Sequence, residues 1–331
     1  MDIQEVLPRD AIPSIDDPSF GSAYFGADDD EVIVVESDPP RAYPVRVLSY
    51  HEIVNDAFGE LPESGTVDTP SAESASDREP IAVTWCPICA SAVVYARTVD
   101  GRVLTFGTSG KLADDALVMY DRETGSEWKQ PLGEAISGPL EGRELDVVPA
   151  SMLSWAQFRA AYPTGVVLQP VRGDTDDPQR PSPRAAYDMT PYERYDSGAA
   201  FGLRAMRGEG PERTWTREDV GPKTPVLGIV HGGDAVGYPL PAVRAEGGVV
   251  SDSVGGLAVL VVGADDDIHA FEHPGHRFEL RDGTLYGDGA SWDLATGRSS
   301  DGRQLPRVPA RRLYAFAWQD DHGERSFYGL N

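Results

Sequence analysis

The sequence predicts a β-rich α+β fold in which two pseudo-symmetric repeats pack together, each made mainly of antiparallel strands with one or two helices. Three observations predict it. Short runs of β-branched and aromatic residues, bounded by Gly, Asp or Ser, recur along the chain. Several groups of residues occur twice in the same order. Helical periodicity is confined to two stretches.

The predicted strands of the first repeat are short apolar runs rich in residues that favour a pleated sheet. They read EVIVVES, IAVTW, AVVYAR, VLTFG and ALVMYD. Two Asp-Gly dipeptides, in VDGR at residues 99–102 and in YGDG at residues 286–289, predict hairpin turns. Such turns need positive φ angles, which Gly and Asp tolerate.

Two stretches have the spacing of an amphipathic helix. In ASMLSWAQFRAAYP, the side chains of Met152, Trp155, Phe158 and Tyr162 recur every three or four residues, and Pro163 ends the helix. The stretch VRVLSYHEIVNDAF is the second predicted helix.

Matching residues in two parts of the chain indicate a duplicated unit. In each part a Tyr-Pro pair, an Asp, a Trp with two following glycines, and the pattern Leu-x-x-Val-Pro-Ala-x-x-Leu occur in this order. The first set is Tyr43, Pro44, Asp56, Trp128, Gly133, Gly138 and Leu145–Leu153, and the second is Tyr238, Pro239, Asp252, Trp292, Gly297, Gly302 and Leu305–Leu313. Residues 80–83 then align with 256–259, which matches Cys86 to Val262 and Cys89 to Asp265.

The duplication divides the chain into four parts. They are an N-terminal extension (1–29), a first repeat with the cysteines (30–168), a connecting segment (169–224) and a second repeat without cysteines (225–331). Within the first repeat, residues 61–79 are rich in Ser, Pro, Glu and Asp and are expected to form a mobile surface loop. The four aromatic residues of AYDMTPYERYDSGAAF predict that this part of the connecting segment packs against the repeats.

The composition excludes several classes of partner. With 54 acidic and 29 basic residues the net charge is -25, and the acids are dispersed along the chain, as in a folded halophilic protein with an acidic surface. Such a field repels nucleic acid and anionic membranes, so neither is an expected partner. The first twenty residues show no basic segment and no apolar core of a signal peptide, so we expect a cytoplasmic location.

Several stretches resemble one known family. They are AYPVRVLSYHEIVND, AVTWCPICASAVVYAR, LTFGTSG, LVMYDRETGSEW and PKTPVLGI, with PRDAIPSIDDPSF at the start. These stretches are similar to domain-of-unknown-function family 3179, and the acidic composition is that of a haloarchaeal-type member. The resemblance implies no particular activity, because none is established for the family. Ala90 departs from the Gly, Ser or Asn that usually follows the second cysteine in this family.

The only two cysteines, Cys86 and Cys89 in WCPIC, are the strongest candidates for chemistry. One interpretation is a redox pair, but the residues after Cys89 have a β pattern rather than the helix that acidifies the first thiol of such motifs. A second is a metal-binding turn between two strands, which would supply half of a tetrahedral site. The third is a pair of buried thiols without a chemical role.

A metal site needs further ligands, and His51 is the first candidate because it lies in the same repeat as the two cysteines. An ordinary surface histidine on a helix is the competing interpretation. His269, His273 and His276 are a second group of histidines close together in sequence. Thiolate and imidazole ligands would favour zinc, copper or iron.

Other polar residues could line the site, although each has a structural alternative such as a cap, an ion pair or a packed ring. They are Asn55, Asp56, Ser109, Asp121, Arg122 and Trp128. The leading hypothesis is a metal-binding or thiol redox protein that uses Cys86 and Cys89. The alternative is a non-catalytic module that binds a small molecule or protein partner in a groove between the repeats. The sequence leaves open whether the chain is an enzyme.

Overall fold

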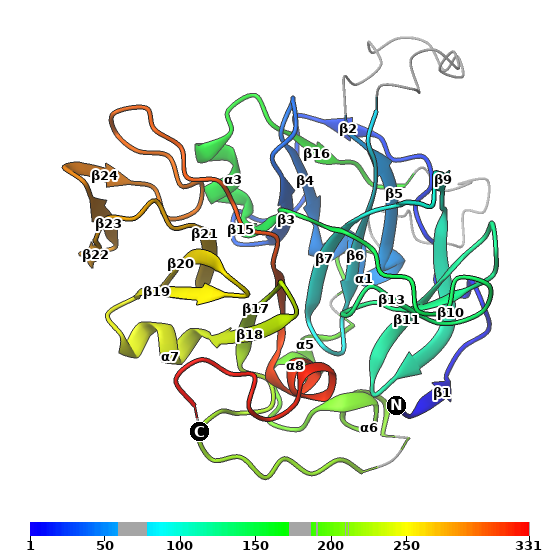
Figure 1. The fold of residues 1–331 in the computed structure, drawn as a ribbon. Coiled ribbons are helices and arrows are strands. Elements are labelled where there is room, and N and C mark those ends of the chain that lie inside the picture. Colours follow the sequence, from blue (N-terminus) through cyan, green and yellow to red (C-terminus); the bar gives the residue numbers. More distant parts are fainter. Residues whose placement is uncertain (59–77, 172–186, 190, 209, 211, 331) are drawn as a thin grey trace.

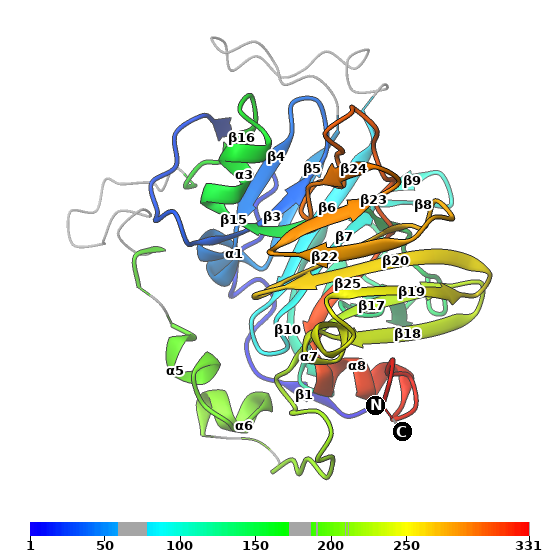
Figure 2. The same cartoon turned by 90° about the vertical axis from the view of Figure 1, so that its left-hand side faces the viewer.

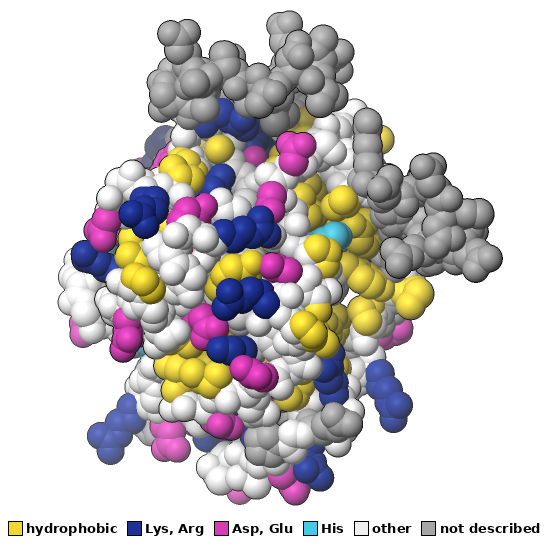
Figure 3. All heavy atoms as spheres, turned by 90° about the vertical axis from the view of Figure 1, so that its right-hand side faces the viewer, with side chains coloured by type: hydrophobic (Ala, Val, Ile, Leu, Met, Phe, Trp, Pro, Cys, Tyr) yellow, Lys and Arg dark blue, Asp and Glu magenta, His cyan; other side chains and the backbone are white. Residues whose placement is uncertain are grey.

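The computed structural model describes residues 1–58, 78–171, 187–189, 191–208, 210 and 212–330 (Figure 1). Antiparallel sheets dominate, as predicted, and none of the helices within these ranges exceeds eight residues. None of them is long and apolar enough to cross a membrane. On the face shown in Figure 3, basic side chains stand among acidic ones, so charge is dispersed over that face as the sequence indicated.

A seven-stranded antiparallel sheet joins the two halves of the chain (Figures 1 and 2). Its main path runs β18 (Asp234–Pro239), β17 (Pro225–His231), β25 (Arg311–Tyr314), β7 (Ser91–Ala96), β6 (Pro80–Cys86) and β5 (Ile53–Ala57), and β14 (Val147–Val148) also pairs with β7. The halves meet where β25 pairs with β7. Cys86 therefore lies in the sheet shared by both halves, and Cys89 lies in the turn between two of its strands.

Two five-stranded sheets and a hairpin complete the first half. One sheet has the order β1 (Ile3–Glu5), β10 (Phe106–Ala113), β11 (Ala116–Asp121), β12 (Glu127–Lys129) and β13 (Glu134–Ser137). The other has the order β15 (Ser151–Ser154), β3 (Glu31–Val35), β4 (Arg41–Pro44), β16 (Val166–Leu168) and β2 (Phe20–Gly21). The predicted VDGR hairpin joins β8 (Thr98–Val99) to β9 (Arg102–Val103), and Asp100 and Gly101 both have positive φ.

Two three-stranded sheets complete the second half. They are β19 (Val249–Val254), β20 (Leu257–Ala264) and β21 (Asp267–Glu272), and β22 (Phe278–Arg281), β23 (Thr284–Gly287) and β24 (Ala290–Trp292). The second predicted turn joins β23 to β24, with positive φ at Asp288 and Gly289.

The helices are α1 (Val45–His51), α3 (Trp155–Ala161), α5 (Glu193–Asp196), α6 (Gly202–Arg207), α7 (Leu240–Ala245) and α8 (Ala315–His322). Both predicted helices exist but are shorter than expected. Met152 lies in β15, because the capping box of Ser154 and Gln157 starts the helix only at Trp155. Likewise α1 ends at His51, and the β-branched residues that follow it pair with β6 as strand β5. Asn55 and Asp56 are therefore strand residues and do not cap a helix.

The connecting segment packs against the rest of the chain at the four predicted aromatic residues. Tyr187, Tyr195 and Phe201 are buried and Tyr192 is half-buried. The Tyr195 hydroxyl donates a hydrogen bond of 2.7 Å to the carbonyl of Ile88, in the turn between the cysteines. The predicted loop 61–79 lies, except for its last two residues, outside the described residues.

The same order of elements occurs in both halves. A hairpin, a helix and three antiparallel strands follow one another as β3–β4–α1–β5–β6–β7 and as β17–β18–α7–β19–β20–β21. The Tyr43 hydroxyl donates to Asp56 at 2.6 Å, and the Tyr238 hydroxyl donates to Asp252 at 2.9 Å. In both halves this bond ties the end of the hairpin to the first strand after the helix.

Removal of these two hydroxyls is expected to destabilise the chain unequally. Tyr43 is fully buried and Asp56 also binds Arg41, so Tyr43→Phe leaves a buried carboxylate with one donor fewer and should lower the free energy of unfolding by about 1.5–3 kcal/mol. Asp252 is half-buried and water can replace the lost donor, so Tyr238→Phe should lower it by about 1 kcal/mol or less. Urea unfolding of both variants measures the difference. Equal losses would contradict this assignment.

Candidate functional site

The two cysteines lie at a tight turn between neighbouring strands, as the sequence predicted. Cys86 ends β6 and pairs with Ser91, which begins β7, and residues 87–90 form the turn between them. Ala90 has a φ of 47°, a left-handed conformation that closes this turn. Both thiols are free and buried. Neither lies at the N-terminus of a helix.

This turn is two residues longer than the corresponding turn of the second half. In the first half, Asp56 is paired with Ile81, and Cys86 lies five residues after Ile81. In the second half, Asp252 is paired with Val259, and Ala264 lies five residues after Val259. Matched through the two aspartates, Cys86 therefore corresponds to Ala264. The expected matches of Cys86 to Val262 and Cys89 to Asp265 are wrong. The cause lies before the turn: matched through the aspartates, residues 80–83 correspond to 258–261 rather than to 256–259. The turn itself also differs, with four residues between Cys86 and Ser91 but only two between Ala264 and Asp267.

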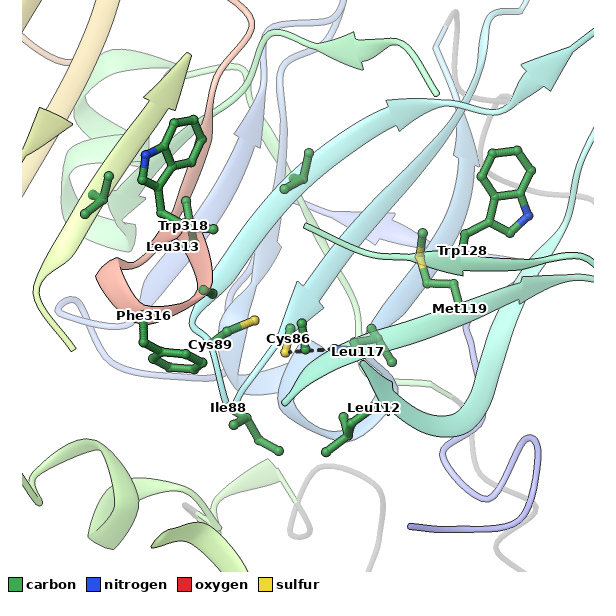
Figure 4. Close-up of a cluster of buried hydrophobic side chains, with 14 of the residues drawn as sticks. Cys86, Ile88, Cys89, Leu112, Leu117, Met119, Trp128, Leu313, Phe316 and Trp318 are labelled. Carbon is green, nitrogen blue, oxygen red and sulfur yellow. Dashed lines mark hydrogen bonds between the residues drawn. The ribbon is translucent and has the colours of Figure 1, made fainter. Parts of the chain in front are cut away.

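The sulfur of Cys86 lies among hydrogen-bond donors. The backbone N–H of Leu117, on β11, donates to it at 3.4 Å (Figure 4). Burial alone would raise the pKa of Cys86, but the thiol of Cys89 and the backbone N–H groups of Cys89, Leu117 and Ile88 outweigh burial and lower it. These donors stabilise a thiolate at Cys86.

Cys89 has the opposite character. It is fully buried, and burial together with the neighbouring Cys86 raises its pKa well above the ordinary value. Figure 4 shows both cysteines in a cluster that also contains Leu117 and Phe316. The two thiols are therefore unequal: Cys86 ionises first, and Cys89 donates a hydrogen bond to it.

A narrow pocket of about 60 Å³ is bordered by Cys86 but not by Cys89. Most of its lining is apolar and comes from the N-terminal segment, β10, β11 and α6. The apolar lining residues are Val6, Leu7, Pro8, Ile12, Pro87, Ile88, Leu112, Leu117, Leu203 and Met206. The lining is completed by Glu52, Cys86, Thr108, Gly110, Lys111, Tyr192 and Arg207. Cys86 is thus the thiol that a small molecule in this pocket would meet.

Glu52 is a site residue that the sequence reasoning missed. It follows the last residue of α1 with a φ of 58°, and the N–H of Trp85 donates to its carbonyl at 2.8 Å. The residue is 7% exposed and borders the pocket. Among the residues that the structure describes, none donates a hydrogen bond to its carboxyl group or forms an ion pair with it. Local sequence gives no signal for this role, because Glu52 reads as the polar end of a helix next to the more conspicuous His51.

Burial and the nearby sulfur keep the Glu52 carboxyl protonated near neutral pH. Burial raises the pKa of Glu52 to about 8, and the negative charge at Cys86 adds to the shift. Burial also raises the pKa of Tyr192, with smaller contributions from Glu52 and Cys86. These three groups therefore share one pocket and influence one another electrostatically.

His51, the proposed third metal ligand, is engaged elsewhere. Its Nδ1 lies 2.7 Å from the carbonyl oxygen of Pro13 and its Nε2 lies 2.6 Å from the hydroxyl of Tyr187. It does not border the pocket of Cys86. Within the described ranges, no group of three or more His, Cys, Asp or Glu side chains is arranged to hold a metal ion.

The other six candidate residues also lie outside this pocket. They connect elements of the first half. Asn55 exchanges hydrogen bonds of 2.8 and 2.9 Å with the backbone of Phe106, and Asp121 accepts a bond of 3.0 Å from the indole of the buried Trp128. The remaining three make similar contacts: Asp56 with Arg41 and Tyr43, Ser109 with the carbonyl of Val118, and Arg122 with Asp16.

Comparison with known proteins identifies the chain by family only. No curated protein and no solved structure matches it. The family model described as "Protein of unknown function (DUF3179)" matches residues 9–66 and 73–325, which is most of the chain. The chain with this cysteine turn therefore belongs to the DUF3179 family.

Proposed function

We propose that the chain is a thiol redox protein in which Cys86 and Cys89 interconvert between a dithiol and a disulfide. The observation that carries the proposal is the inequality of the pair. Cys86 borders a pocket and has donors that stabilise its thiolate, whereas Cys89 lies behind it as a neutral thiol within hydrogen-bond reach. In thiol exchange, an attacking cysteine reacts with the oxidant as a thiolate, and a resolving cysteine then completes the disulfide. Cys86 has the properties of the first and Cys89 those of the second.

The chemistry balances with a small disulfide as oxidant. The Cys86 thiolate attacks one sulfur of R–S–S–R, the S–S bond breaks, and one RSH leaves after taking up a proton. Cys89 then loses its proton and attacks Cys86 Sγ, which releases the second RSH and forms the Cys86–Cys89 disulfide. Two protein thiols are oxidised and one substrate disulfide is reduced to two thiols. A cytoplasmic location, where thiols are kept reduced, would fit this cycle.

A thiophilic ion held by the same two sulfurs is the second candidate. It is supported by the convergence of the two sulfurs at one turn, which would supply two of the four ligands of a zinc site, or ligands for copper or iron. His51 would have to leave both of its partners to join them. This candidate therefore needs a rearrangement that the thiol proposal does not need.

We also infer that the two halves, roughly residues 30–168 and 225–330, are repeats of one unit. The matching order of elements and the paired bonds Tyr43–Asp56 and Tyr238–Asp252 support this inference. So does a second pair of equivalent contacts: the N–H of Leu145 donates to the carbonyl of Gly133, and that of Leu305 to Gly297, both at 2.9 Å. Only the first repeat carries the longer cysteine turn.

Redox titration tests the function. The folded protein is equilibrated in dithiothreitol buffers of increasing oxidation, alkylated, and weighed by intact mass spectrometry, with metal content measured on the same sample. We expect the oxidised form to lose two hydrogens through a Cys86–Cys89 disulfide. With oxidised 2-mercaptoethanol, a disulfide of a monothiol that cannot cyclise, Cys89→Ala should instead trap a mixed disulfide at Cys86, and Cys86→Ala should remain unmodified.

The outcomes separate the candidates. Two thiols that stay reduced in the folded wild-type protein under diamide would overturn the redox proposal. Stoichiometric metal that blocks both thiols and is absent from Cys86→Ala would replace it with the metal site. Circular dichroism of each variant verifies that the fold is retained.

A further inference from the structure

We propose that the pocket over Cys86 is a reaction site for small or slender hydroperoxides, in which Glu52 donates a proton to the leaving oxygen. The inference rests on the proposed thiol function and names its oxidant. It stands on three observations: the size and lining of the pocket, the position of Cys86 on its wall, and the buried carboxyl group of Glu52 on the same wall, which has no hydrogen-bond or ion-pair partner among the described residues.

The pocket limits what can reach the sulfur. A cavity of about 60 Å³ holds only a few groups the size of a water molecule, given about 10–15 Å³ for each. Cys86 itself is 1% exposed. A protein disulfide or a bulky, charged peptide disulfide does not fit such a space. Hydrogen peroxide, or the end of an unbranched alkyl hydroperoxide, does.

The charges of the lining favour an uncharged reactant. Apolar residues from the N-terminal segment, the cysteine turn, β10, β11 and α6 together form most of the wall. Of the two basic residues, Lys111 is paired with Glu127 at 2.8 Å and Arg207 is exposed. Among the described residues that line the pocket, an anionic reactant would therefore find no free buried cation to neutralise it, and it would lose its hydration. Hydroperoxides are neutral at physiological pH.

The unpartnered carboxyl group distinguishes a peroxide from a disulfide. A thiolate is a good leaving group, because the pKa of an ordinary thiol is about 8.5. Hydroxide leaves poorly, since the pKa of water is 15.7, and it needs a proton in the transition state. A protonated Glu52 beside the Cys86 thiolate supplies that proton, and its raised pKa keeps the proton in place near neutrality. Disulfide exchange does not need a proton donor beside Cys86, whereas cleavage of an O–O bond does. Glu52 therefore favours a hydroperoxide over a disulfide as the reactant.

The reaction balances as follows. The Cys86 thiolate attacks the terminal oxygen of R–O–O–H, the O–O bond breaks, and the Glu52 proton goes to the departing RO⁻, giving ROH and a Cys86 sulfenic acid. Cys89 attacks this sulfur through its thiolate, the hydroxyl leaves as water, and the disulfide forms. The net change is two thiols and ROOH to one disulfide, ROH and water. A small dithiol reductant returns the pair to the reduced state.

The test compares a reagent whose leaving group needs a proton with a reagent whose leaving group does not. Rates of Cys86 modification are measured for hydrogen peroxide and for iodoacetamide, whose iodide leaves without protonation, in wild type, Glu52→Gln and Asp196→Asn. All rates are expressed per thiolate from the pH dependence of alkylation. Glutamine keeps the shape of Glu52, and Asp196 is an exposed acid on neighbouring α5 that does not border the pocket.

We expect Glu52→Gln to slow the peroxide reaction by about 100-fold or more while the iodoacetamide rate per thiolate changes by less than about threefold. Asp196→Asn should change neither. A linear alkyl hydroperoxide should react faster than cumene hydroperoxide, whose aromatic group exceeds the pocket. Equal losses for both reagents, or no loss for either, would overturn the role of Glu52.

Failure of this inference can be told apart from failure of the redox proposal. The cysteine pair could form its disulfide with diamide but react with hydrogen peroxide no faster than free cysteine does. This result would support the redox function and refute the peroxide site. If the cysteine pair forms no disulfide with either oxidant, both the redox function and the peroxide site are refuted. The same protein preparation gives both readings.

Discussion

Replacement of Lys129 by methionine is expected to lower the free energy of unfolding by about 3–5 kcal/mol at pH 8. Lys129 is one of only three lysines in the chain. Its side chain is 2% exposed, and its Nζ lies 2.6 Å from Asp321 Oδ1 and 2.8 Å from Asp114 Oδ2. Asp321 is equally buried, so methionine would leave a carboxylate in the interior without its cation.

The effect should depend on pH in a defined direction. Burial raises the pKa of Asp321 to about 6, even though Lys129 lowers it. A carboxyl group with a raised pKa in the fold makes the chain progressively less stable as the pH rises from its ordinary pKa of 3.8 to about 6, and the loss levels off above that. Without Lys129 that loss becomes larger. The difference between variant and wild type should therefore be largest above pH 7 and shrink towards pH 5.

Urea unfolding at pH 5 and pH 8 measures both claims. The double variant with Asp321→Asn should recover much of the loss, because the unpaired charge is gone. Arg143→Met is the matched control: Arg143 pairs with Asp100 at 3.0 Å, but both side chains are more than half exposed, so its loss should be below about 1 kcal/mol. A Lys129→Met variant no less stable than Arg143→Met would refute the buried network.

Local features of the fold were predictable from the sequence because local physics determines them. Asp100-Gly101 and Asp288-Gly289 form hairpin turns because few residues adopt the φ angles required there. The strand character of residues on both sides of the cysteines follows from their β-branched side chains. Helix ends were less predictable. Asn55 and Asp56 continue a helical pattern in sequence, and only pairing with β6 makes them strand residues.

The candidate site was predictable only in part, because long-range contacts build it. The sequence indicated the turn that carries Cys86 and Cys89. It did not indicate which thiol would be ionised, since one of the donors is the N–H of Leu117, on another sheet. Nor did it separate Glu52 from His51, because adjacent residues at a helix end point in different directions. His51 turns towards Pro13 and Tyr187, and Glu52 towards the pocket.

Glu52→Gln is expected to stabilise the chain at alkaline pH and to leave its stability nearly unchanged at pH 4–5. The pKa of Glu52 is about 8 in the folded state and 4.5 in its ordinary state. A raised carboxyl pKa means that stability is fully present below 4.5 and is lost as the pH rises through 8. The difference of about 3.5 pKa units corresponds to about 3–5 kcal/mol at pH 9, which glutamine would restore.

Unfolding curves of Glu52→Gln and wild type between pH 5 and pH 9 give the result directly, with the exposed Glu79→Gln as the control that should show no divergence. In the Cys86→Ala background the divergence should level off at a lower pH and be smaller, because loss of the thiolate charge lowers the pKa of Glu52. Parallel curves for Glu52→Gln and wild type would mean that the carboxyl group is solvated, and the peroxide site would lose its proton donor. Divergence, in contrast, would show that the fold bears an unfavourable buried acid at the one place where the proposed chemistry needs a proton.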